Sequence, residues 1–182
     1  MIPKPDECFA LLRKYKVPEH IIQHSRIVHA VALYLCQALL GQREKLDQDL
    51  IEASSLLHDI AKLKSLNTGE SHPRAGALLL SSLGYPEVAE IVRQHVVLDD
   101  GIPSAQITEV ALVHYADKRV KHTEIVSLAG RFQDLKKRYG KSPAALAWLE
   151  DLEEKSFVLE EQIFQRLPIK PESLASVVSP EY

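Results

Sequence analysis

The feature that most constrains this chain is a group of polar residues inside an apolar stretch. In the run from Leu56 to Lys62, His58, Asp59 and Lys62 interrupt residues with the pattern of a buried helix. Burying such groups without partners costs several kcal/mol, so other parts of the chain must compensate them. Imidazole and carboxylate are ligands for divalent cations, and Lys62 would share their helical face. The stretch indicates either a metal site or a core histidine hydrogen-bonded to a carboxylate.

Length and charge narrow the class of protein. With 182 residues, 46% of them hydrophobic, the chain can bury one sizeable core, and we expect one domain. A net charge of -3 argues against a broad surface that binds nucleic acid, so no nucleic-acid partner is expected. A local basic pocket for a phosphate group is compatible with this charge. Cys8 and Cys36 lack the spacing of a thiolate zinc site, and a reduced, cytoplasmic setting fits them.

The chain has no pattern of a secretion signal or a membrane span. Its first residues, Met1 to Asp6, lack an apolar segment behind a basic one. The longest nearly apolar run, Ile27 to Leu40, is shorter than the roughly 20 residues that a bilayer requires. We therefore expect no contact with a membrane.

Apolar residues recur at helical spacing through most of the chain, and no strand pattern is evident. Helices are predicted over residues 5–15, 18–40, 49–62 (capped by Asp49), 72–83, 86–96 and 105–121. A loop is expected just past Lys62. The region up to Leu167 predicts two more helices, broken near Gly140, and the Pro- and Ser-rich end predicts a flexible tail.

The predicted fold is therefore all-α, a single-domain helical bundle. Residues 1–122 would form its main part, residues 123–168 a C-terminal helical hairpin packed on the same domain, and residues 169–182 the tail.

Several ligand-type side chains are predicted to face the interior of this bundle. His24, for example, is in line with Val28, Val31 and Leu35, whereas His29 points away from that face. The set lies on or at the ends of five different predicted helices, and a bundle can bring such residues together in its core. Its members are His24, His58, Asp59, His72, His95 and Asp117.

The order of these residues resembles that of the HD superfamily of metal-dependent phosphohydrolases, named for the doublet that His58 and Asp59 would form. The local contexts are similar too, at residues 24–28, 56–62 and 115–118. The resemblance covers residues 18–120 and implies an HD-type fold. It also implies that His24, His58, Asp59 and Asp117 bind one metal ion.

A second resemblance concerns the histidines between the doublet and the final aspartate. The segment from His72 to Ala77 is similar to a helix start in bacterial HD hydrolases that cleave diadenosine tetraphosphate symmetrically. In such binuclear branches two further histidines help to hold a second metal, which implies that role for His72 and His95 and a bridging role for Asp59. The alternatives are a helix-terminal histidine at 72 and, at 95, a cation that favours the helix dipole.

Other branches of the superfamily fit less well. Ile60-Ala61-Lys62 follows the doublet where (p)ppGpp hydrolases carry acidic residues. Gln94-His95 stands where HD-GYP cyclic di-GMP phosphodiesterases have paired histidines.

The implied chemistry is phosphoryl hydrolysis by metal-activated water. Asp59 and Lys62 are the predicted catalytic residues. Lys62, Arg26 and Arg74 are predicted to bind the phosphate of the substrate. The alternative for each of these three cations is a solvated charge on the protein surface. The cofactor would be one or two divalent ions, of Fe, Mn, Co, Ni or Mg. We expect a small phosphorylated substrate, with a nucleotide the favoured class; the alternative is an HD-fold module that senses nucleotide without turnover.

Three other histidines and the tryptophan are predicted to have no direct role in binding metal or substrate. His29 and His122 are predicted to face solvent, and His114 either supports Asp117 or is a packed helix residue. Trp148 is predicted to pack within the hairpin rather than to stack on a base.

Overall fold

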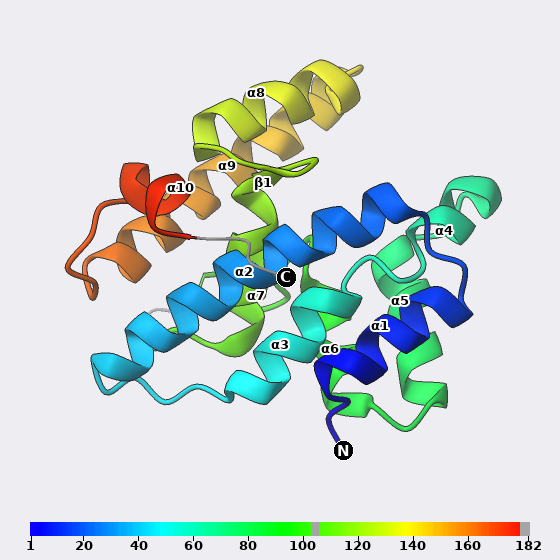
Figure 1. Ribbon diagram of the computed structural model, residues 1–182. Helices are drawn as coiled ribbons and strands as arrows, with labels where there is room; N and C mark the ends of the chain where they lie inside the picture. The colour runs from blue at the N-terminus through cyan, green and yellow to red at the C-terminus, as the bar shows by residue number, and fades with distance from the viewer. Residues whose placement is uncertain (103–105, 179–182) are drawn as a thin grey trace.

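The computed structural model describes residues 1–102 and 106–178, with only the backbone described at residues 66 and 67. The fold is all-α, as predicted (Figure 1). The elements are α1 (Pro5–Lys14), α2 (Glu19–Gly41), α3 (Gln48–Leu57), α4 (Lys62–Thr68), α5 (His72–Ser82), α6 (Pro86–Gln94), α7 (Glu109–Lys118), β1 (Val120–Lys121), β2 (Glu124–Ile125), α8 (Leu128–Tyr139), α9 (Pro143–Phe164), η1 (Pro171–Ser173) and α10 (Leu174–Val177).

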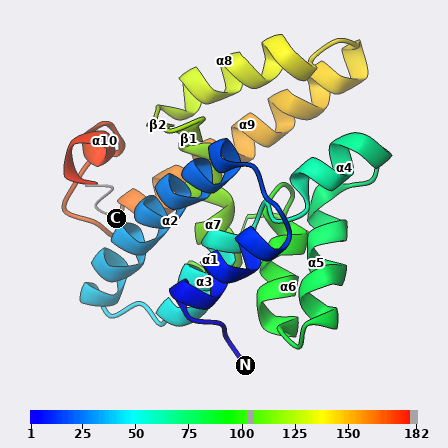
Figure 2. The ribbon, with the colours of Figure 1, turned by 45° about the vertical axis from the view of Figure 1, so that its right-hand side comes forward.

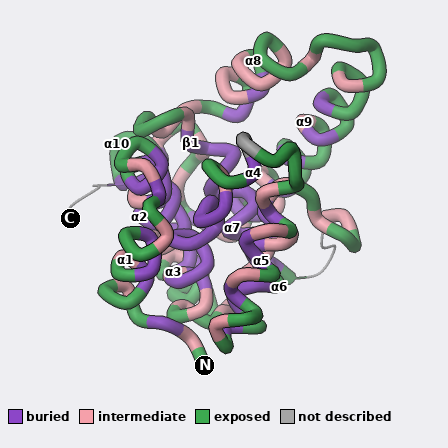
Figure 3. Tube along the Cα trace, turned by 90° about the vertical axis from the view of Figure 1, so that its right-hand side faces the viewer, coloured by how far each residue is buried: buried purple, intermediate pink, exposed green. Residues whose placement is uncertain are grey.

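Helix α2 is the central element, and buried residues run along most of its length. It packs against α3 and α7, while α5 and α6 lie side by side at the edge of the molecule (Figure 2). Helix α7 is buried from Ala111 to Lys118, as its purple trace shows in Figure 3. The carriers of His24 and Asp117 are therefore held against each other in the interior.

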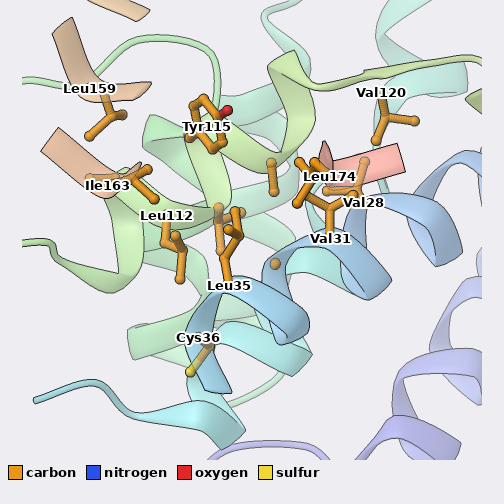
Figure 4. Close-up of a cluster of buried hydrophobic side chains, with 14 of the residues drawn as sticks. Val28, Val31, Leu35, Cys36, Leu112, Tyr115, Val120, Leu159, Ile163 and Leu174 are labelled. Carbon is orange, nitrogen blue, oxygen red and sulfur yellow. The ribbon is translucent and has the colours of Figure 1, made fainter. Parts of the chain in front are cut away.

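Two clusters of apolar side chains hold the bundle together. In the larger one, residues of α2 such as Val31 and Leu35 meet Leu112 of α7 and Ile163 of α9 (Figure 4). The smaller cluster joins α1, α3, α5 and α6 through residues such as Leu57 and Leu80. The C-terminal part of α3 belongs to the smaller cluster and α7 to the larger one, so the polar residues at the ends of these helices lie where the two clusters meet.

The predicted C-terminal hairpin is formed by α8 and α9, and its far end extends away from the bundle (Figures 1 and 3). Its near end is anchored by buried polar contacts. Arg119, directly after α7, pairs with Glu160 of α9 at 3.0 Å and donates from Nη2 to the carbonyl of Pro171 at 3.0 Å. These contacts fix the hairpin relative to α7.

The prediction of a flexible tail from residue 169 is wrong for the part that the structure describes. Residues 171–177 form η1 and α10, and Leu174 is fully buried in the larger cluster beside Val28 and Val31 (Figure 4). Pro- and Ser-rich composition suggested a loose end, but one leucine and one valine, Val178, provide enough apolar surface to dock it. Residues 179–182 lie outside the described residues.

Several boundaries also differ from prediction. Asp47, not Asp49, caps α3 by accepting a hydrogen bond from the Leu50 amide. The helix predicted over 105–121 begins at Glu109, because Thr108 caps it, and Ala105 lies outside the described residues. A minimal antiparallel pair, β1 and β2, was not predicted; His122 turns the chain between them with a positive φ of 55°.

Within the described ranges 1–102 and 106–178, no helix combines the length and the apolar character needed to cross a bilayer.

Candidate metal centre

A break in the helical structure presents the His58–Asp59 doublet. The helix predicted over 49–62 ends at Leu57, and a turn follows, with the Ile60 amide bonded to the Leu57 carbonyl and the Lys62 amide to the Asp59 carbonyl. The loop expected past Lys62 is instead the short helix α4. Both side chains of the doublet reach the same interior space, since His58 Nε2 lies 3.4 Å from Asp59 Oδ2.

One group of ligand atoms forms around His24 and His58. Their Nε2 atoms lie 3.2 Å and 3.7 Å from Asp117 Oδ1, and 4.0 Å and 3.4 Å from Asp59 Oδ2. Ligand atoms of His24, His58 and Asp59 all lie within 4.8 Å of one another, and all three residues are buried. The structure thus brings together the first four predicted ligands.

A second group forms on the other side of Asp59. Asp59 Oδ1 lies 3.3 Å from His72 Nε2 and 3.7 Å from His95 Nε2, and the two histidine nitrogens are 3.2 Å apart. These three residues also have ligand atoms within 4.8 Å of one another. Asp59 is therefore shared, with one carboxylate oxygen toward each group, as a bridging ligand would be.

Backbone carbonyls orient three of the histidines. Nδ1 lies 2.9 Å from the His122 carbonyl for His24, 2.8 Å from the Ser55 carbonyl for His58 and 2.7 Å from the Val92 carbonyl for His95. Since a carbonyl only accepts, each Nδ1 is the donor, and Nε2 is left as the ring atom directed toward the carboxylates.

Wherever Nε2 carries no proton, acceptor atoms face one another across this buried space, an arrangement that a cation stabilises. Among the described residues, His58 Nε2 and Asp59 Oδ1 are buried atoms with no hydrogen-bond partner. Nitrogen and carboxylate oxygen are the donors that Mn, Fe, Co, Ni and Zn accept in proteins. The residues present thus fit one or two divalent ions.

The charge states of the site suit ligation. Burial raises the pKa of Asp59, but His58, His95 and Lys62 outweigh it and hold that pKa well below its ordinary value. Asp117 is likewise kept ionised, since Lys118 and His24 outweigh the effect of burial on its pKa. Both carboxylates can therefore donate to a cation without first losing a proton.

The histidines differ in their affinity for protons. Burial lowers the pKa of His95, and it lowers the pKa of His72 to about 4. For His58 burial also acts to lower the pKa, but the negative charges of Asp59 and Asp117 raise it overall. A proton and a metal ion would compete for His58 Nε2.

Two lysines pair with the site's carboxylates. Lys62 Nζ lies 2.6 Å from Asp59 Oδ2, and Lys118 Nζ lies 2.9 Å from Asp117 Oδ2 while donating to the His95 carbonyl at 3.1 Å. Lys118 was missed in the sequence analysis, and it is only 3% exposed. It connects Asp117 of one group to His95 of the other.

The site opens into a cavity of about 330 Å³. Ligands and lysines of the site form one part of its wall together with Val96, and the hairpin forms the rest. The lining residues are Asp59, Lys62, His72, His95, Val96, Asp117, Lys118, Arg131, Leu135, Tyr139, Trp148, Leu149 and Leu152. Arg131 was not predicted, and Trp148, expected to pack inside the hairpin, is 46% exposed and lines this cavity.

Two of the predicted substrate-binding residues do not line this cavity. The Arg26 guanidinium lies over the ring of Phe9, 4.4 Å from its centroid, and Arg74 is exposed on α5. Their alternative explanations, packing and surface charge, fit the structure. Lys62 is the one of the three that lies in the cavity wall.

The other histidines have structural contacts. His29 is buried, not solvent-facing as predicted, and its Nδ1 lies 3.2 Å from Ser55 Oγ. The prediction failed because α2 is covered on more than one side. His114 Nδ1 donates to the His95 carbonyl at 3.0 Å and thus supports that histidine rather than Asp117. His122 is exposed, as predicted.

Comparison with known protein families shows to which family a chain with this arrangement of histidines and aspartates belongs. The HD domain family matches residues 21–121, more than half of the chain, and the match includes every histidine and aspartate of both groups. The chain belongs to the HD domain family. The predicted membership of the HD superfamily of metal-dependent phosphohydrolases is thereby confirmed.

Curated relatives of this HD protein carry the name of a different activity. It is 27% identical over 142 residues to a tRNA (cytidine(56)-2'-O)-methyltransferase of Picrophilus torridus, a match that covers 70% of this chain and 39% of that one. A protein of the same name from Thermoplasma volcanium is 29% identical over 113 residues, covering 62% and 31%. The chain thus spans well under half the length of these relatives. No solved structure matches it significantly.

Proposed function

We propose that this HD protein is a metal-dependent phosphohydrolase that cleaves a phosphoester or phosphoanhydride bond in a small molecule, with a nucleotide the favoured class. The observation that carries the proposal is the position of Asp59, whose two carboxylate oxygens face two separate groups of histidines. A carboxylate shared in this way is typical of two-metal hydrolytic centres.

His24, His58, Asp59 and Asp117 would hold one ion, and His72, His95 and Asp59 the other. Bound divalent ions lower the pKa of water and polarise a phosphoryl oxygen, which is the chemistry that phosphate hydrolysis needs. The carbonyls that fix the Nδ1 atoms of His24, His58 and His95 keep the ligands pre-oriented, so little reorganisation is needed on binding.

The cations of the cavity support a phosphorylated substrate. Among the described residues, Lys62, Lys118 and Arg131 line the cavity together with two carboxylates, those of Asp59 and Asp117. Divalent ions would add further positive charge, so the loaded cavity attracts polyanions. Lys62 is 37% exposed at its side chain and can turn from Asp59 to a phosphate oxygen once metal neutralises that carboxylate.

The test is an activity panel with the protein loaded in turn with Mn, Fe, Co, Ni and Mg. Nucleoside mono-, di- and triphosphates, dinucleoside polyphosphates and simple phosphate esters are incubated with it, and released phosphate and nucleotide products are measured. The dinucleoside polyphosphates belong in the panel because residues 72–77 resemble enzymes that cleave them. Hydrolysis with at least one metal is expected, and no turnover with any of them would refute the proposal.

A matched pair of variants ties activity to the site. Asp59→Asn should remove turnover and metal retention together, because it weakens the ligand that both groups share. Asp6→Asn changes an exposed carboxylate in the first turn of α1 and should behave as wild type. Activity in Asp59→Asn near that of Asp6→Asn would contradict the mechanism.

A second candidate is a binding module that takes up a nucleotide without turnover. It is favoured by the relatives, since the chain matches only 39% and 31% of proteins named for a methyl transfer. Binding of a nucleotide to the metal-loaded protein, combined with no hydrolysis across the panel, would establish this candidate instead.

A further inference from the structure

We infer that the C-terminal hairpin determines which phosphates this HD protein accepts: Arg131 of α8 binds the phosphate, and Trp148 of α9 with Tyr139 of α8 binds a planar ring attached to it. The inference rests on the proposed function in so far as the ligand is a phosphorylated small molecule. It goes further by assigning roles to residues outside the span of residues 21–121 that the family match covers.

The cavity has two chemically different walls. One carries the candidate metal ligands Asp59, His72, His95 and Asp117. The other is formed by the hairpin and is mostly apolar, with Leu135, Leu149 and Leu152 around the two aromatic side chains. A ligand that fills about 330 Å³ would therefore touch both walls, with its charged end toward the carboxylates and lysines and an apolar part toward the hairpin.

The positive charge of the Arg131 guanidinium is only partly compensated by carboxylates of the described residues. Within the described residues its one ion pair is with Asp134, at 3.5 Å, and its buried Nε has no hydrogen-bond partner there. Asp134 is shared with Lys121 at 3.5 Å and with Arg138 at 3.0 Å. One carboxylate thus serves three cations, and the positive charge left over points to an anionic ligand beside Arg131.

The aromatic side chains are held at the cavity although they are poorly buried. Trp148 is 46% exposed and Tyr139 is 60% exposed. Large aromatic rings gain most when a flat partner covers them, and stacking of a base on an aromatic side chain is tolerant of base identity. Their position in the wall opposite the metal ligands therefore suits the ring of a nucleoside phosphate better than a sugar phosphate without a ring.

The chain offers a direct probe of this contact, because Trp148 is its only tryptophan. Adenosine 5′-monophosphate and ribose 5-phosphate carry the same phosphoester and differ by the base. Titration of the full chain with each, with Mg²⁺ and again with a chelator, is followed by tryptophan fluorescence and by calorimetry. The adenine compound should change the fluorescence and bind about tenfold more tightly than ribose 5-phosphate. Equal affinities would overturn the inference.

Matched variants locate the preference. Trp148→Leu should lower the affinity for the adenine compound to that for ribose 5-phosphate, whereas Phe157→Leu, a partly exposed aromatic on the same helix that does not line this cavity, should keep the preference. Tyr139→Leu, at a more exposed position, gives the same test should Trp148→Leu fold poorly. A preference unchanged in both cavity variants would overturn the ring assignment.

Arg131 is tested in the same way. Arg131→Gln should weaken both ligands by a similar factor, about tenfold, because both carry the phosphate. Arg138→Gln removes the other α8 arginine that pairs with Asp134 and should leave both affinities unchanged. Equal behaviour of the two arginine variants would overturn the assignment of Arg131.

The two proposals fail separately. Ring preference without hydrolysis under any metal would refute the phosphohydrolase and leave the hairpin's role intact. Hydrolysis at equal rates for both probes, unaffected by Trp148→Leu, would refute the hairpin's role and leave the phosphohydrolase intact.

Discussion

Replacing Leu174 by alanine should destabilise the whole bundle, although the residue lies near the chain end. Leu174 is fully buried and packs beside Val28 and Val31 of α2, the helix that carries His24 (Figure 4). Leucine-to-alanine changes in such positions cost about 2–5 kcal/mol, because apolar contact is lost and a cavity remains. For a chain of this size the loss corresponds to a melting temperature lower by about 5–15 °C.

The assay is urea unfolding followed by far-ultraviolet circular dichroism, with a chelator present so that bound metal adds nothing to the free energy of unfolding. Val177→Ala is the matched control, since Val177 belongs to the same short helix but is 38% exposed. That control should change the free energy of unfolding by less than about 1 kcal/mol. Equal stability of the two variants would refute the docking of residues 171–178 on α2.

Three further predictions concern single residues. Burial lowers the pKa of His29 to about 4, so the contribution of the neutral ring to stability is complete above pH 6.5 and is lost as the pH falls toward 4. In urea unfolding, His29→Gln should therefore lose about 3 kcal/mol less stability than wild type over this pH range. Parallel pH profiles of the two proteins would contradict this. Arg119→Met should cost about 3–5 kcal/mol in the same assay, because Glu160 loses its cationic partner and keeps only the Tyr115 hydroxyl among the contacts described. Lys155→Met, in the exposed pair with Asp151, should cost less than about 1 kcal/mol, and similar losses in the two variants would refute the anchoring role. In elemental analysis, His72→Ala should hold one metal ion per chain in place of two. His20→Ala, which changes an exposed histidine on α2, should retain both ions. A second ion retained in His72→Ala would rule out His72 as a ligand.

Much of the site could be located from sequence because its residues stand out against apolar helical faces. His24, aligned with Val28 and Val31, and Asp117, aligned with apolar residues of its helix, had to face the interior of a bundle. The periodicity of the apolar residues thus predicts toward which side of a helix a side chain points. It does not supply the turn at residues 58–61, because Ile60 and Ala61 continue the apolar pattern and only the observed backbone shows α3 ending at Leu57.

The residues that sequence reasoning missed are those whose burial depends on distant parts of the chain. Lys118 is a residue type that is seldom buried. Its charge is compensated by the carboxylate of its neighbour Asp117 and by the carbonyl of His95, which lies 23 residues away in the chain. Arg131 and Trp148 belong to a hairpin whose amphipathic pattern explains its own packing. Nothing in that pattern indicates that it forms a wall of the cavity next to Asp59.

The most direct test of the shared role of Asp59 is an anomalous-scattering map of crystals grown with Mn²⁺. Two peaks are expected, one within coordination distance of His24, His58, Asp59 and Asp117 and the other within coordination distance of Asp59, His72 and His95. A map with no peak beside Asp59 would contradict the metal centre, and a single peak that leaves His72 and His95 uncoordinated would contradict the bridging carboxylate.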